Sequence, residues 1–245
     1  MRYIFPALTF MGGVVAAYIA IIYLVSKKKR RIENRILTVT CIGSAIWSIC
    51  FAALFLQTNA DFAFICRAIG MIGVFMYLIS AQMLVCQIAK VNKKCKYIMN
   101  GIAFTGIIVY FLVVRKSQII FKYTSWGMTY RFKSGLANNI YILYCVCLAI
   151  NFFLVAMYMM KSDKKRIRVY GKHFLLAEIF IAAGMVLDTI FPLLGVSAIP
   201  GSTLTQFWGM MVLYNATLIV SRSYITVDNM SNFIYDSLAV PVNNK

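Results

Sequence analysis

The sequence predicts an all-α membrane protein, a polytopic bundle of seven transmembrane helices with its N-terminus outside and its C-terminus in the cytoplasm. Three observations support this prediction. Hydrophobic residues make up 62% of the 245 residues and charged residues only 13%, whereas a soluble domain carries roughly a quarter charged residues. Seven apolar stretches each approach the length of about 20 residues that a helix needs to cross hydrocarbon. Basic residues crowd into the loops on alternate sides of these stretches.

The seven spans fill most of the chain and form one membrane domain, residues 1–221. A short tail, residues 222–245, follows it. The first span is not a cleavable signal peptide, because only Arg2 precedes its apolar run and the strong positive flank follows it. It is expected to remain as an anchor. We expect the spans at 3–25, 36–56, 64–88, 97–114, 139–160, 174–194 and 203–220.

The net charge of +18 is explained by loop charges that set the orientation. Three clusters, at 27–35, 90–96 and 161–172, hold 16 of the 25 lysines and arginines, and each follows an odd-numbered span. The positive-inside rule places these loops in the cytoplasm, where they also contact anionic lipid headgroups. The lipid bilayer is therefore the expected partner of the basic residues, and nucleic acid is not. A multi-pass membrane protein fits this pattern.

The longest outer loop, 115–138, predicts a β-hairpin that caps the bundle. Two short β-prone runs, 118–125 and 128–133, meet at Trp126 and Gly127. Tyr123, Trp126 and Tyr130 are candidate ligand-binding residues, because aromatic side chains combine rigid contact area with polar groups. Alternatively, these aromatic residues rest in the membrane interface, where Trp and Tyr gather in any case.

No motif for enzymatic chemistry is present. The chain lacks a phosphate-binding G-x-x-x-x-G-K-[ST] loop, an H-E-x-x-H pair and a C-x-x-C pair, and His173 is its single histidine. We therefore predict no catalytic residue, no metal site and no cofactor.

Two carboxylates fall inside the sixth span, where ionisable groups are functional hypotheses by default. Glu178 lies about one helical turn from the cytoplasmic edge, so its side chain is expected to reach water or Lys172. Asp188 lies in the outer half of the span. Ten residues separate the two carboxylates, which is about 15 Å along a helix, too far for a catalytic pair.

Pro192 follows Asp188 by four residues. Proline cannot donate to the carbonyl four residues earlier, and its ring clashes there, which predicts a bend at Asp188 and a free carbonyl. Arg67, at the outer interface, is the candidate partner of Asp188, and the two residues with the Trp126 loop form the predicted ligand pocket. The alternative is that Pro192 only ends the helix and that Asp188 lies at headgroup depth.

The tail predicts a helix that continues from the seventh span into the cytoplasm. Met230, Phe233 and Ile234 belong to a set of apolar residues that recur at helical spacing. These residues, with Pro192 as the hinge, are the candidates for relaying a signal between subunits, so a homodimer is expected. An amphipathic helix lying on the membrane surface would show the same periodicity.

Several of these features together resemble a known family, the seven-helix membrane input region at the N-terminus of some bacterial sensor histidine kinases, which is also found fused to diguanylate cyclases. The resemblance covers nearly the whole chain. It rests on the span count, the outside N-terminus, the external "WGMTYRF" loop, "DTIFPLLG" near the end of the sixth span, and the tail "NMSNFIYDSLAVPV". The tail looks like the helix that leads into a PAS sensor domain.

The resemblance implies a domain that senses an external or membrane-dissolved signal and passes it through the last helix to a cytoplasmic output. The chain departs from the family because it stops at Lys245, where the output domain would begin. As given, it is expected to be non-enzymatic and to act on a kinase or cyclase output that it does not contain. The rival interpretation is a small-solute transporter or channel, although no internal repeat is evident. A scaffold subunit without a ligand of its own is a third possibility.

Overall fold

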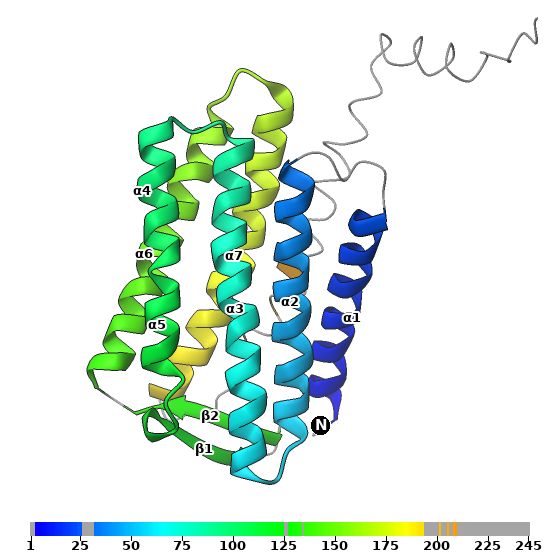
Figure 1. The fold of residues 1–245 in the computed structure, drawn as a ribbon, viewed down its shortest axis with the longest axis vertical. Coiled ribbons are helices and arrows are strands. Elements are labelled where there is room, and N and C mark those ends of the chain that lie inside the picture. The colour runs from blue at the N-terminus through cyan, green and yellow to red at the C-terminus, as the bar shows by residue number, and fades with distance from the viewer. Residues whose placement is uncertain are drawn as a thin grey trace, which may run out of the picture.

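The computed structural model describes residues 3–25, 32–124, 127–133 and 135–193, together with Gly201, Thr205, Trp208 and Gly209. This part of the chain is mostly helical. Its long helices run side by side, and a short β-hairpin closes one end of the bundle (Figure 1). We call this the hairpin end; the N-terminus lies there as well.

The elements follow one another with short connections. Their bounds are α1 Ile4–Val25, α2 Ile32–Leu56, α3 Ala60–Ile88, α4 Lys93–Phe104, α5 Gly106–Val113, the 3₁₀ turn Lys116–Gln118, β1 Ile119–Thr124, β2 Gly127–Phe132, α6 Leu136–Met160 and α7 Lys165–Leu193. Five helices in the described ranges are long and apolar enough to cross a membrane: α1, α2, α3, α4 with α5 as one span, and α6. The chain is therefore a membrane-embedded helical bundle.

The sequence-predicted spans agree in position with these helices, and the structure extends several of them. The span expected at 64–88 begins at Ala60, because the Asn59 side chain accepts a hydrogen bond from the Asp61 N–H and so caps the helix start. The predicted sixth span overlaps α7, which is not among the five helices named above. Gly201, Thr205, Trp208 and Gly209 are helical, and the rest of the 203–220 span lies outside the described residues, as do Met230, Phe233 and Ile234 of the tail.

Helices α2 and α3 cross at two glycines. A Cβ added to Gly73 would lie 2.4 Å from the backbone N of Trp47 and 2.6 Å from the Gly43 carbonyl oxygen. A Cβ added to Gly43 would lie 2.9 Å from the Gly73 carbonyl oxygen. In hydrocarbon, helices associate through such close backbone packing of small residues, because lipid tails are as apolar as the helices. This crossing forms the centre of the bundle.

The span predicted at 97–114 is made of two consecutive helices instead of one. Side-chain hydroxyls occupy two carbonyls that would otherwise accept helical N–H groups at the joint. Thr105 Oγ1 donates to the Ile102 carbonyl at 2.7 Å, and the Tyr144 hydroxyl of α6 donates to the Ala103 carbonyl at 3.0 Å. Such competition with the backbone destabilises and bends helices, and it coincides with the one-residue break between α4 and α5 at Thr105.

The hairpin confirms the prediction made from the outer loop. Strands β1 and β2 pair antiparallel, with Ile119 opposite Phe132, Phe121 opposite Tyr130, and Tyr123 opposite Met128. These apolar residues share one face, because directly opposed residues of a sheet point to the same side. Lys122 and Arg131, on the alternate face, are exposed.

Gly127 fixes the hairpin on the bundle. Its φ of +112° is unfavourable for residues with a side chain, and an added Cβ would lie 2.2 Å from the Phe55 carbonyl oxygen of α2.

We expect Gly127→Ala to cost about 1–3 kcal/mol of local stability and to lift the hairpin from α2. Limited trypsin digestion at Lys122 and Arg131 should then accelerate. Gly135→Ala is the matched control, because Gly135 has extended backbone and nothing within 4 Å of an added Cβ; equal digestion of the two variants would contradict this expectation.

The bend expected at Asp188 does not interrupt α7, which stays helical from Lys165 through Asp188 and Pro192 to Leu193. The side chains of Asp188 and Pro192 lie outside the part of the chain that the structure describes.

Candidate functional site beneath the hairpin

Arg67 of α3 is a fully buried cation, with 0% of its residue surface exposed. It lies about two turns from the start of α3, at the level where the hairpin crosses the bundle. Arg67 was expected at the outer interface of the membrane as the partner of Asp188. In the structure the hairpin covers it.

The contacts of Arg67 come from α5 and β2. Nη1 donates to the Val113 carbonyl at 3.3 Å, and because Val113 is the last residue of α5, that carbonyl has no helical N–H of its own to accept. The positive charge also suits the negative end of the α5 dipole. The guanidinium carbon lies 4.6 Å from the ring centroid of Tyr130 and 4.8 Å from that of Phe132. Each contact is a cation–π interaction, of about 2 kcal/mol or more where water is excluded.

The rings around Arg67 connect the hairpin to the helices. Tyr130 packs edge-on against Phe51 of α2, with 5.9 Å between ring centroids, and Phe132 lies 5.3 Å from Tyr141 of α6. We call Phe51, Tyr130, Phe132 and Tyr141 the aromatic cluster. The hairpin therefore forms a lid that reaches α2, α3 and α6 through one buried guanidinium and the rings beside it.

Arg67 is incompletely satisfied in this arrangement. Its Nε and Nη2 have no acceptor in hydrogen-bond geometry; the Tyr130 hydroxyl lies near the guanidinium but outside that geometry. In the described residues no carboxylate lies within ion-pair distance of Arg67; the ion pair found there joins Lys116 to Asp61 near the surface. A buried donor without an acceptor costs about 1–3 kcal/mol, and more when it is charged. The closed lid therefore holds a cation whose best partner, a carboxylate or phosphate, is not supplied by the side chains described around it.

The predicted ligand-binding residues are brought together only in part. Tyr130 and Arg67 are in direct contact. Tyr123 is on the same hairpin face but is 46% exposed near the strand end, so it lies at the edge of the lid. Trp126 and the Asp188 side chain lie outside the described residues. The Val113 carbonyl could not be identified from the sequence, because nothing in an apolar run marks which carbonyl will accept a hydrogen bond from another helix.

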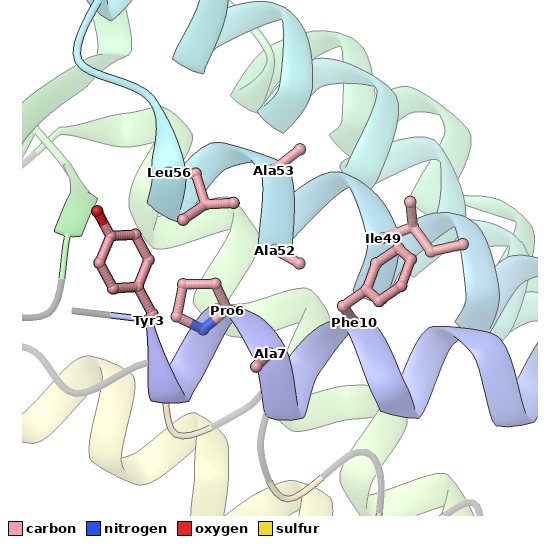
Figure 2. Close-up of a pocket in the computed structure, with 8 residues that line it drawn as sticks. All are labelled: Tyr3, Pro6, Ala7, Phe10, Ile49, Ala52, Ala53 and Leu56. Carbon is pink, nitrogen blue, oxygen red and sulfur yellow. The ribbon is translucent and has the colours of Figure 1, made fainter. Parts of the chain in front are cut away.

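A separate groove lies between α1 and α2 near the hairpin end and encloses about 450 Å³. Figure 2 shows Phe10 and Ile49 at one end of it and Tyr3 and Leu56 at the other. Its remaining lining residues are Pro6, Ala7, Ala52 and Ala53. The size is within the range of ligand pockets, but such pockets orient their ligands with a few placed polar groups. This lining is almost wholly apolar and suits hydrocarbon, so we do not assign polar recognition to it.

The fold and this site together define the protein as a helical membrane bundle. A hairpin that rests on a buried arginine closes one end of the bundle. No family model matches the chain, and no curated protein matches it.

Proposed function

We propose that the chain is the sensor domain of a membrane receptor, which recognises a small anionic ligand at Arg67 and relays its presence through the last helix to a cytoplasmic output. The observation that carries the proposal is Arg67, a buried cation with two unsatisfied donors under a hairpin lid. The positive-inside pattern of the loops would place this lid outside the cell. Exposed Lys122 and Arg131 on the lid's outward face would attract anions toward it.

The lid gives the proposal a mechanism. While it is closed, Arg67 is held by one carbonyl and two aromatic faces. When it opens, a carboxylate or phosphate can bind the guanidinium through two parallel hydrogen bonds, which are stronger than those Arg67 makes in the closed state. A ligand that binds only the open state shifts the population toward it. Because the lid touches α6, which packs against α7, its movement would change the packing of α7.

The proposed signal relay involves the tail of the chain, a second subunit and an output partner. A homodimer in the bacterial cytoplasmic membrane would let the 222–245 helices of two subunits meet, with Pro192 as the hinge. The output would be a kinase-like or cyclase-like partner, as the resemblance of the tail implies.

Transport of a small solute is the second candidate function. The joint between α4 and α5 favours it, because interrupted helices line the sites of many transporters. Transport requires that the bound anion crosses the membrane, whereas sensing requires binding without flux.

We expect small carboxylates or inorganic phosphate to bind wild-type protein in sealed vesicles and not to be taken up. Binding is measured as a change in tryptophan emission, to which Trp126 of the hairpin turn contributes, and uptake with the same anions carrying a radiolabel. Trp126→Phe identifies the share of the signal that comes from the lid. Radiolabel accumulating inside protein-containing vesicles, but not inside empty ones, would replace sensing by transport.

A further inference from the structure

A second polar site lies in the interior, between α3 and α7. Tyr77 of α3 is fully buried, and its hydroxyl has no hydrogen-bond partner. Glu178 of α7 has a buried carboxyl oxygen, Oε1, that also has none. The Glu178 side chain as a whole is half-buried, although Oε1 itself is not exposed; that the side chain reaches water or Lys172 stays a prediction.

The surroundings of this pair offer no counter-charge. The groups electrostatically close to the Tyr77 hydroxyl are Glu178, Cys41 of α2 and Tyr170 of α7. His173 binds the Val169 carbonyl through Nδ1 at 2.9 Å, and Lys172 is exposed. The predicted last span, 203–220, contains no Lys, Arg, His, Asp or Glu. A carboxylate at Glu178 would therefore face neutral groups in the described part of the chain.

Gly209 of the predicted last span lies against α7 next to Glu178. A Cβ added to Gly209 would lie 3.2 Å from the Ala177 carbonyl oxygen and 3.1 Å from Cγ1 of Ile181. Ala177 directly precedes Glu178, and Ile181 lies one turn beyond Ala177. The backbone thus approaches α7 closely at Gly209, at the level of this carboxyl group.

We propose that Glu178 is an intramembrane proton-binding site, which holds its proton while α3, α7 and the last span are packed together. Burying a neutral carboxylic acid costs far less than burying an unpaired carboxylate. Loss of the proton places a negative charge between α3 and α7. This charge draws water toward the carboxylate and loosens the packing of Gly209 against α7. This site is separate from Arg67, and the proposal does not depend on the ligand.

The proton is observed directly by infrared spectroscopy of the full chain in lipid nanodiscs. At neutral pH we expect the C=O band of a protonated carboxylic acid in the wild-type protein, which disappears as the pH is raised. The band should be missing from Glu178→Gln and present in Asp163→Asn, whose exposed side chain makes it the control. Absence of the band from wild type at neutral pH overturns the proposal whether or not Glu178→Gln folds. Loss of the band on adding sodium at fixed pH also overturns it, because the site would then bind a metal cation.

Unfolding equilibria give a second readout. The folded chain holds a proton that the unfolded chain releases above about pH 4.3, so stability falls as the pH rises until the folded state also loses the proton. The unfolding equilibrium constant of the wild type should rise by up to tenfold per pH unit relative to that of Glu178→Gln. Parallel pH profiles of the two proteins would contradict proton binding at Glu178.

Discussion

Gly73→Leu is expected to prevent the bundle from assembling. A Cβ at this position lies 2.4 Å from the Trp47 backbone N, and backbone cannot move aside as the end of a flexible side chain can. Overpacking in well-packed interiors costs about 1–3 kcal/mol when neighbours adjust. At Gly73 the helices themselves must separate, so we expect a loss at or above the top of that range. Folding is measured by denaturant titration in detergent and by the yield of monodisperse protein.

Gly101→Leu is the matched control for this variant. Gly101 lies within α4, and an added Cβ there meets nothing within 4 Å. Leucine should be tolerated at Gly101, or should stabilise the helix by up to about 1 kcal/mol, since glycine is a poor helix former. If the two variants fold equally well, the Gly43–Gly73 crossing does not hold α2 against α3.

Arg67→Met is expected to abolish anion binding while leaving the protein at least as stable as the wild type. Methionine fills a similar apolar volume beside Tyr130 and Phe132, and it removes the unsatisfied Nε and Nη2 donors. Removal of two buried donors without acceptors, each costing about 1–3 kcal/mol, offsets the loss of the two cation–π contacts and of the Val113 hydrogen bond. Stability is measured by denaturant titration, and binding by the anion titration described above.

Arg131→Met separates the buried cation from the general charge of the lid. Arg131 is exposed on the outward face of the hairpin, so its loss should slow anion association and leave the binding site in place. A large loss of stability in Arg67→Met, with anion binding equal to that of Arg131→Met, would make Arg67 a structural residue and remove the basis of the proposed function.

The helices and the hairpin could be predicted because their signals are local. A run of about 20 apolar residues is enough to define a membrane helix, and Gly127 between aromatic strands is enough to define a hairpin turn. The joint at Thr105 could not be predicted, because it depends on the Tyr144 hydroxyl, which another helix brings to the Ala103 carbonyl.

Of the residues at the candidate site, Arg67 and Tyr130 were predicted from the sequence, but their contact with each other and with Val113 was not. Counting residues along a helix gave the depth of Arg67 and of Glu178, since rise per residue is constant. It gave no information on what covers them. Arg67 was expected at the outer interface, and nothing along its own helix indicated the apolar hairpin face that covers it, with Tyr130 and Phe132, because that face is distant in sequence. The proximity of Tyr77 to Glu178 was not predicted for the same reason, because Tyr77 belongs to another helix.

The measurement that tests the account most directly is the rate at which an arginine-specific dicarbonyl reagent modifies Arg67 in the wild type and in Gly127→Ala, followed by peptide mass spectrometry. If the hairpin is a lid, Arg67 should react slowly in the wild type, faster in Gly127→Ala, and more slowly again when an anion is bound. Arg131 should react quickly and equally in both proteins. An Arg67 that stays unmodified in both, while Arg131 is fully modified, would show that the hairpin does not open and would contradict recognition at Arg67.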